Sequence, residues 1–429
     1  GYFKYANFFF DVFNVLHESN FHLENIVLPL AISFFTFQQI TYLIDAYRGL
    51  TKEYRFLHYC LFVTFFPQLI AGPIVHHKEM LPQFTKNISY KLDPTHLSIG
   101  ITIFVLGLFK KVVFADSIST YATPVFDAAE SGVILTFFEA WLGALAYTFQ
   151  LYFDFSGYSD MAIGLARMFG IILPVNFYSP YKANSIIEFW RRWHITLSHF
   201  LRDYLYFPLG GNRKGSFHRY INLMITMLLG GFWHGAGWTF IIWGGMHGIF
   251  LSINHGWNIL TRKVYTERRE RGRVAKVTGH FLTFGAVIIA WVMFRAENVN
   301  VAMNIYSSMF GFNGISLPGT FELKFGELGE TMKTLGFNFK GMFHNGAIDD
   351  IKTGIFLLIT MTSITLFCPN TLDWLNAKKP ALNLNSVMIK RSEKLVWRFN
   401  SLFAVLLAFL SVVCILSMSS PSEFLYFRF

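Results

Sequence analysis

The sequence predicts an all-α fold, a polytopic bundle of transmembrane helices. Of the 429 residues, 53% are hydrophobic and 14% are charged, whereas about 25% are charged in a typical soluble domain. The apolar stretches are continuous and do not alternate, which favours membrane helices over a β-barrel. This composition excludes a disordered chain and disfavours an ordinary soluble enzyme.

Eleven apolar segments are candidate spans, and no internal repeat separates them, so we expect one membrane domain over 1–429. The chain opens with Gly1-Tyr2-Phe3-Lys4 and enters an apolar run at once, so we expect further spans upstream in the whole protein. The segments are 5–17, 26–44, 57–75, 97–116, 133–153, 155–174, 220–233, 237–255, 279–295, 352–368 and 399–418.

Loop charges predict how these segments are oriented. Residues 182–219 and 261–277 each hold seven Lys and Arg against two acidic residues, and 369–398 holds six against two. Residues 296–351 hold three Lys against six acidic residues. By the positive-inside rule the three basic segments are cytoplasmic and 296–351 lies outside. The net charge of +10 therefore reflects topology, and we expect no nucleic-acid partner.

Both flanks of 220–255 are basic, so this stretch is expected to enter the membrane and return. Its centre, 230–237 (GGFWHGAG), is rich in glycine, which tolerates the backbone angles of a tight reversal. The first arm, 220–233, spans roughly 21 Å as a helix, less than a full crossing. We expect a re-entrant hairpin that holds His234 at depth.

Residues 185–201 mix apolar and basic positions and predict an amphipathic helix at the membrane interface. The glycine-rich segment 210–215 follows, with Arg213 and Lys214. It is either a phosphate cradle or a plain cytoplasmic turn, and it lacks the P-loop spacing.

His234 is the sharpest candidate for chemistry, because an ionisable residue at membrane depth is costly and suggests function. A neutral imidazole suits proton abstraction. The alternative is a core histidine bonded to a backbone carbonyl. His194 carries the weaker claim, since its aromatic neighbours also fit an interfacial anchor.

Asp154 and Asp160 lie in an apolar region, where acids need partners. They orient a histidine, bind a hydroxylated substrate or, the interpretation we favour, pair with an arginine. Ser156 and Ser159 are not expected to be nucleophiles, because YFDFSGYSD is not a GxSxG elbow. Cys60, Cys368 and Cys414 are far apart, and no HExxH spacing occurs, so we predict neither a disulfide framework nor a metal site.

Five segments together resemble the membrane-bound O-acyltransferase (MBOAT) family, in its branch that acetylates alginate and other bacterial polysaccharides. They lie in family order and are 65–74 (FFPQLIAGPI), 152–160 (YFDFSGYSD), 189–198 (FWRRWHITLS), 201–212 (LRDYLYFPLGGN) and 232–238 (FWHGAGW). The family's catalytic histidine matches His234, and its second polar active-site position matches His194. The resemblance also implies a central tunnel through the bundle.

The resemblance implies O-acetyl transfer from a cytoplasmic thioester such as acetyl-CoA, across the bacterial inner membrane, to an extracytoplasmic polysaccharide. No bound cofactor is expected, and an extracytoplasmic acetyltransferase is the expected protein partner. His234 acts as general base, and His194 polarises the thioester carbonyl or orients the donor. Residues expected at the substrate are Asp154, Ser156, Asp160, Arg192, Trp193 and Trp233, with Arg213 and Lys214 for the phosphates of the donor.

Two other functions stay open. Within the family, the chain transfers D-alanine or another acyl group to a cell-wall polymer. Outside it, the chain is a transporter or flippase without covalent chemistry, or a scaffold of a secretion complex, although transporters usually carry repeats that this sequence lacks.

Overall fold

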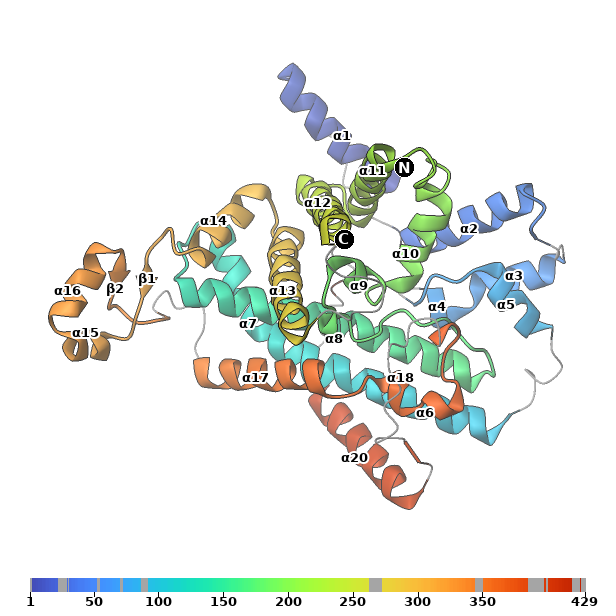
Figure 1. The fold of residues 1–429 in the computed structure, drawn as a ribbon. Helices are drawn as coiled ribbons and strands as arrows, with labels where there is room; N and C mark the ends of the chain where they lie inside the picture. Colours follow the sequence, from blue (N-terminus) through green and yellow to red (C-terminus); the bar gives the residue numbers. More distant parts are fainter. Residues whose placement is uncertain are drawn as a thin grey trace.

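The computed structural model describes residues 2–21, 29, 31–51, 55–69, 72–85, 92–261, 272–343, 350–384, 397–398, 400–418 and 425. Helices make up almost all of its regular structure, as predicted (Figure 1). The described strands are two residue pairs, β1 (Ile315–Ser316) and β2 (Phe337–Asn338), which pair in parallel. They belong to a small extension at one end of the molecule, with α15 (Gly319–Phe325) and α16 (Glu327–Thr334).

The helix α8 (Phe137–Met168) runs through the centre. The helices that pack against it are α6 (Pro94–Phe109), α7 (Asp116–Glu130), α13 (Arg273–Arg295), α14 (Val299–Met309) and α17 (Ile351–Phe367). Helix α8 begins at a capping box in which Thr136 and Glu139 each bond the other's backbone N–H. The prediction of two spans, 133–153 and 155–174, is wrong. Asp154 and Asp160 do not interrupt the helix, because lysine side chains neutralise both carboxylates.

A second long helical stretch lies beside α8. It consists of α6 (Pro94–Phe109), a π-helical turn η2 (Lys110–Ala115) and α7 (Asp116–Glu130). The contact is close because glycines face each other: a Cβ on Gly107 would lie 2.6 Å from the carbonyl oxygen of Gly157. The π turn points Lys110 and Lys111 at the two aspartates of α8.

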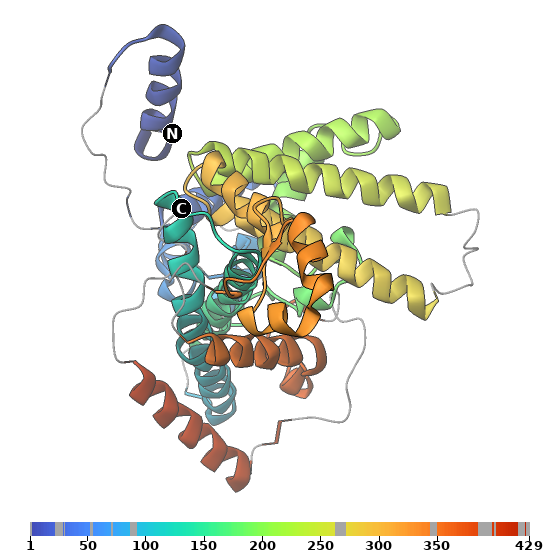
Figure 2. The ribbon, with the colours of Figure 1, turned by 90° about the vertical axis from the view of Figure 1, so that its left-hand side faces the viewer.

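The reversal expected in 220–255 is confirmed, whereas its depth in the membrane stays a prediction. Helices α11 (Ser216–His234) and α12 (Trp238–Thr261) lie side by side and reverse at Gly235 (Figure 2). A Cβ on Gly231 would lie 2.2 Å from the carbonyl oxygen of Phe240, so the two helices need glycine at this crossing. The first arm is 19 residues rather than the 14 expected, because the helix already begins at Ser216.

The expected interfacial helix over 185–201 is wrong. Two short helices stand there instead, α9 (Ile186–Trp190) and α10 (Ile195–Leu201), followed by a π-helical turn η4 (Arg202–Tyr206). The helix is interrupted between α9 and α10, where His194 adopts left-handed backbone angles. Trp193 and His194 are buried, so their side chains face the interior of the protein rather than its surface.

The remaining helices surround this centre. On the N-terminal side they are α1 (Tyr2–His17), α2 (Ile32–Tyr47), α3 (Phe56–Thr64), α4 (Phe66–Leu69) and α5 (His77–Phe84). A 3₁₀ turn η3 (Pro180–Lys182) follows α8. After the hairpin come α13 (Arg273–Arg295), α14 (Val299–Met309), α17 (Ile351–Phe367), α18 (Thr371–Trp374), η5 (Asn376–Lys378) and α20 (Ser401–Ser417).

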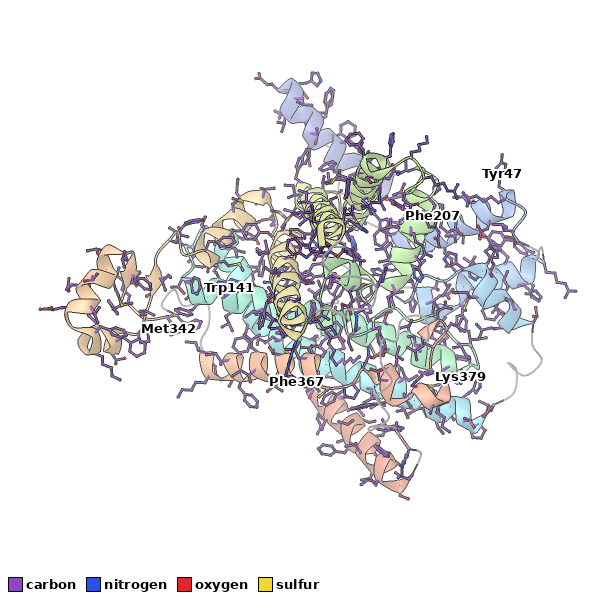
Figure 3. All side chains as sticks on the ribbon, in the orientation of Figure 1. Tyr47, Trp141, Phe207, Met342, Phe367 and Lys379 are labelled. Carbon is purple, nitrogen blue, oxygen red and sulfur yellow. The ribbon has the colours of Figure 1, made fainter. Side chains whose placement is uncertain are left out.

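By length and composition, two described helical stretches are sufficient to cross a membrane. They are Pro94–Glu130 and Arg273–Arg295, in which an 18-residue window reaches a mean hydropathy of 2.0 and 1.8. Helices Ile351–Phe367 and Ser401–Ser417 are apolar but shorter. Large apolar side chains also project outward, among them Tyr47 and Phe367 (Figure 3). Parts of the charged segments 261–277, 296–351 and 369–398 lie outside the described residues, and their sidedness stays a prediction.

Candidate active site

His234 is the last residue of α11, and its side chain is buried at the turn of the hairpin. Three aromatic rings surround its imidazole. Trp233 lies 4.9 Å away, Trp243 of α12 lies 5.2 Å away, and Phe294 of α13 lies 5.3 Å away, each in an edge-to-face arrangement. The hairpin and α13 together hold the ring in an apolar cage.

Lys4 of α1 caps the C-terminal end of α11 with hydrogen bonds. Its Nζ donates to the carbonyl oxygens of Trp233 at 2.6 Å and His234 at 3.0 Å, and to Ser33 Oγ at 3.2 Å. Carbonyl groups at a helix C-terminus lack intrahelical partners and carry partial negative charge. The ammonium therefore satisfies the helix end at the residue that carries the imidazole.

His194 is the N-cap residue of α10, with φ 40° and ψ 54°. The left-handed region is rarely adopted by residues with a side chain, and such backbones concentrate at functional sites. The ring is buried, and its Nδ1 lies 3.1 Å from Asn176 Oδ1. Phe155 meets it edge-on at 4.8 Å.

A third histidine belongs to the same region. His247 of α12 is buried, and its Nδ1 accepts a hydrogen bond from Trp190 Nε1 at 3.2 Å. Trp243 contacts both His234 and His247 edge to face. Lys4 bonds the carbonyl of His234. Ring contacts through Trp291, Trp193 and Phe177 connect Trp243 to His194. The fold thus gathers three histidines and one lysine from separate segments.

Hydrogen bonds define the tautomers of the two outer histidines. Trp190 donates to His247 Nδ1, so the proton of neutral His247 is on Nε2. Asn176 Oδ1 accepts from His194 Nδ1, so the Nε2 atom of neutral His194 carries a lone pair. Neither Nε2 atom has a hydrogen-bond partner within the described part of the chain. The cluster thus offers one buried acceptor and one buried donor near His234.

The two aspartates expected at the substrate pair with lysines, not with the arginine we predicted. Asp154 Oδ1 lies 2.7 Å from Lys111 Nζ, and Asp160 Oδ2 lies 2.6 Å from Lys110 Nζ. Asp154 also accepts from the backbone N–H of Leu425 at 3.3 Å. Both carboxylates therefore fasten α8 to the π turn.

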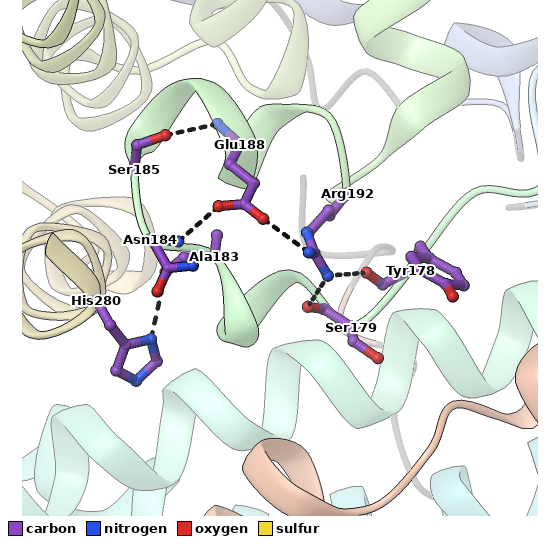
Figure 4. Close-up of polar contacts among 8 residues, drawn as sticks. All are labelled: Tyr178, Ser179, Ala183, Asn184, Ser185, Glu188, Arg192 and His280. Atoms are coloured by element: carbon purple, nitrogen blue, oxygen red, sulfur yellow. Dashed lines mark hydrogen bonds and ion pairs between the residues drawn. The ribbon is translucent and has the colours of Figure 1, made fainter. Parts of the chain in front are cut away.

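Arg192 is buried and bonds residues on both sides of the loop that leads to His194. Its guanidinium lies 2.7 Å from Glu188 Oε1 and reaches the carbonyl oxygens of Tyr178 and Ser179 at 3.4 and 3.5 Å (Figure 4). The other carboxylate oxygen of Glu188 accepts from the Asn184 N–H at 2.8 Å. The backbone N–H of Tyr178 in turn donates to the Arg192 carbonyl.

Three further expected residues take different positions. Trp193 packs in an aromatic cluster whose nearest ring, Trp291, lies 4.9 Å away. Trp233 stacks on Phe37 at 4.8 Å and borders His234, so it is at the centre. Ser156 is buried, and its Oγ has no hydrogen-bond partner among the described residues.

Arg213 and Lys214 lie in an exposed turn between η4 and α11. The turn is closed by Gly210, whose carbonyl accepts from the Arg213 N–H at 3.1 Å, and by Asn222, whose amide donates to the Gly211 carbonyl at 2.9 Å. Both cations are thus available to an anion at the surface. The described residues contain no group of three or more His, Cys, Asp or Glu that would hold a metal ion.

An open cavity of about 590 Å³ lies at the hairpin turn, close to His234 in sequence. Its lining combines an exposed indole, Trp238, with the acidic and amide side chains of Asp11, Glu297, Asn298 and Asn300. Groups of this kind suit hydroxyl-rich ligands, because carboxylates accept and amides donate and accept.

Sequence reasoning missed Lys4, Asn176 and the pairing of His247 with Trp190. Lys4 had a usable signal, since it is a lone cation in an apolar run. Asn176 had none, because its role depends on His194 and Thr196 folding back onto it.

Comparison with known proteins agrees with the resemblance. The family model described as MBOAT, membrane-bound O-acyltransferase family, matches residues 13–295. The chain is 48% identical to a peptidoglycan O-acetyltransferase of Helicobacter pylori, over 74% of this chain and 63% of that protein. It is 42% identical to a probable alginate O-acetylase of Pseudomonas putida, over 100% of this chain and 81% of that protein.

A third relative, a teichoic acid D-alanyltransferase of Streptococcus thermophilus, is 30% identical over 62% of this chain and 68% of that protein. The chain thus spans less than two thirds of the Helicobacter relative and most of the other two. The matched region, 13–295, includes both His194 and His234. The chain belongs to the membrane-bound O-acyltransferase family.

Proposed function

We propose that the protein is a membrane-bound O-acetyltransferase that passes an acetyl group from a cytoplasmic thioester, such as acetyl-CoA, to an extracytoplasmic polysaccharide. The observation that carries this proposal is that His234 and His194, two buried histidines from separate motifs, border one aromatic cluster. Ring contacts join them through Trp243, Trp291, Trp193 and Phe177. Acetyl transfer to alginate or to another bacterial polysaccharide fits the names of the relatives at 42% and 48% identity.

The chemistry follows from the cage around His234. As general base, the neutral imidazole takes the proton of the acceptor hydroxyl while its oxygen attacks the thioester carbonyl. The C–S bond breaks, the thiolate leaves and His234 returns the proton to it. The apolar walls formed by Trp243 and Phe294 exclude water, which suppresses hydrolysis of the thioester.

His194 has one of the two roles expected from the sequence. A bare Nε2 accepts a hydrogen bond and does not polarise a carbonyl, so we assign it to the orientation of a reactant. Asp154, Asp160 and Arg192 hold the helices and the loop around the cluster rather than the substrate itself.

The two substrates enter from opposite sides in this proposal. The exposed cations Arg213 and Lys214 attract a phosphate-bearing donor at the cytoplasmic face. The cavity beside Trp238 and Glu297 admits the hydroxyl-bearing acceptor, or a partner acetyltransferase that carries the acetyl group onward. The cellular location in this scheme is the bacterial inner membrane.

D-alanyl transfer to a cell-wall polymer is the second candidate, supported by the 30% identity to a teichoic acid D-alanyltransferase. The two reactions share the same base and differ in the acyl group. O-linked D-alanine on the polymer, in place of acetate, would decide for this candidate.

The test measures the O-acetyl content of the extracellular polysaccharide by NMR, in cells that make the full-length protein at matched membrane levels. His234→Ala and His194→Ala are expected to lose acetate while polymer yield stays unchanged. His218→Ala, an exposed histidine, is the control and should retain acetate. Unchanged acetate in His234→Ala would return this residue to a structural role, and uptake without acyl product would favour a transporter.

A further inference from the structure

We propose that Asn176 is the positioning residue of His194: it fixes the imidazole in one tautomer, so that a bare Nε2 faces the reaction centre as a hydrogen-bond acceptor. This inference rests on the proposed function and deepens it. The residues involved come from α8, the segment between α8 and α9, and the start of α10.

The orientation of the Asn176 amide is defined by its partners. The backbone N–H of Thr196 points at Oδ1 from 3.3 Å, and a backbone N–H only donates, so this atom is the carbonyl oxygen. The Thr196 hydroxyl also donates to it at 2.9 Å, and that hydroxyl oxygen itself accepts from the Ile74 N–H at 3.0 Å. At the other end of the amide, Nδ2 donates to Ser159 Oγ at 3.0 Å.

Since Oδ1 is an acceptor, His194 must donate to it from Nδ1. The proton of the neutral ring is then committed to Asn176, and Nε2 carries a lone pair. Asn176, Ser159, Thr196 and His194 are all buried, so water does not compete for these bonds. The Ile195 N–H also bonds the Asn176 carbonyl at 2.9 Å, which ties the strained backbone of His194 to the same residue.

Within this network, His194 Nε2 is a buried atom that has no hydrogen-bond partner among the residues that the structure describes. Unsatisfied polar atoms at full burial are rare in native proteins, and one at a site calls for an explanation. A ligand that brings a polar hydrogen, an O–H or an N–H, supplies the missing partner. Two reactants carry such a group: the sugar acceptor, through a hydroxyl next to the one that reacts, and the thioester, through an amide in its arm. Both the hydroxyl and the amide would donate a hydrogen bond to Nε2, and the kinetic experiment below distinguishes between them.

The first experiment is a double-mutant cycle in membranes that contain the full-length protein. Asn176→Leu removes the acceptor at similar volume, and we expect kcat to fall roughly 10- to 100-fold, because misplacing a positioning group by about 1 Å can cost about 10²-fold. Asn176→Asp keeps an oxygen toward Nδ1 and Thr196, and it should restore most of the rate. Asn304→Leu, a half-buried amide bonded to Val133, is the matched control and should leave the rate unchanged.

A residue that acts through His194 loses its effect when His194 is absent. Asn176→Leu should therefore cost nothing further in a His194→Ala background. A loss of equal size in both backgrounds would overturn the proposal and leave Asn176 a merely structural residue. A raised KM for the polysaccharide in Asn176→Leu identifies the hydroxyl as the ligand of Nε2, and a raised KM for the thioester identifies the amide.

The second experiment does not depend on activity. Nitrogen-15 NMR of the histidine-labelled protein, with the signal of His194 assigned by its loss in His194→Ala, reports which ring nitrogen carries the proton. A protonated Nδ1 in the wild type that is lost or mixed in Asn176→Leu is expected. A protonated Nε2 in the wild type would overturn the inference. Failure of acetyl transfer in the wild type would overturn the proposed function and leave this measurement intact.

Discussion

The Lys4 ammonium lies 3.0 Å from the carbonyl oxygen of His234, although 230 residues separate the two along the chain. Lys4 also contacts the carbonyl of Trp233, and its charge lies 5.7 Å from the centre of the Trp233 ring. Helix α1 is thus attached to the C-terminal end of α11 where the candidate base sits. The hairpin turn is held from outside as well as by its own glycines.

Replacing Lys4 with methionine should loosen the hairpin turn. The substitution keeps the length of the side chain but removes a charge-assisted bond to two carbonyls, a loss of about 1–3 kcal/mol. We expect a lower thermal-unfolding midpoint in detergent and reduced acetyl transfer. Ser33→Ala removes the third contact alone and serves as the control. Equal midpoints for Lys4→Met and the wild type would show that the contact does not stabilise the turn.

The ion pair between Lys111 and Asp154 should be among the costliest to break. Asp154 is buried, and Lys111→Met would leave its carboxylate without the ammonium that lies 2.7 Å away. Loss of one partner of a buried pair costs about 3–5 kcal/mol, whereas apolar replacement of both partners is often neutral. Thermal unfolding should therefore show a large loss for Lys111→Met and partial recovery for Lys111→Met with Asp154→Leu.

The exposed pair of Lys333 and Glu322 is the matched control, since its side chains are 39% and 46% exposed. Lys333→Met should leave the unfolding midpoint close to that of the wild type, because an exposed ion pair is screened by solvent. If the two lysine variants lost the same stability, the pair in α8 would have no special role in joining α8 to the π turn.

The crossing of α6 and α8 should not tolerate a methyl group. Alanine at Gly107 would bring its Cβ to 2.6 Å from the Gly157 carbonyl, and the neighbouring backbone has little room to move. Overpacking of this kind costs about 1–3 kcal/mol. Gly285→Ala is the control, because a Cβ there meets no atom within 4 Å and the position lies within α13. A stable Gly107→Ala variant would mean that the two helices are free to separate.

Local patterns were sufficient to predict the helix reversal and the burial of His234 at its turn. The glycine-rich centre at 230–237, flanked by basic segments, predicted a reversal, and the chain reverses between His234 and Trp238. The same reasoning failed for α8, because the apparent break at Asp154 disappears once Lys111, 43 residues earlier, neutralises it. The contact between Lys111 and Asp154 depends on the π turn η2, which the periodicity of the sequence does not predict.

In the candidate site, too, some residues could be predicted from the local sequence and others depend on contacts that form on folding. His234 could be chosen from its own neighbours, because an ionisable group in an apolar stretch is costly. His194 could be linked to His234 only through the family resemblance. Its own neighbours predicted an interfacial helix, whereas the helix ends before His194 and the imidazole is buried. Asn176 and Lys4 act through contacts that form only in the folded molecule.

Arg192 provides the last prediction, because it and Arg191 are adjacent but lie in opposite environments. Arg192 is buried and bonds Glu188 and two backbone carbonyls, whereas Arg191 is exposed. Arg192→Met would leave Glu188 without its cation and free the loop that leads to His194. We expect a loss of about 3–5 kcal/mol in unfolding free energy and a fall in acetyl transfer.

Arg192→Lys should recover only part of the stability, because an ammonium does not reproduce the planar fork that reaches Glu188 and the carbonyls together. Arg191→Met should resemble the wild type in both assays. An Arg192→Met variant as stable as Arg191→Met would contradict the view that this guanidinium fastens the loop, and the position of His194 would then depend on Asn176 and the aromatic rings alone.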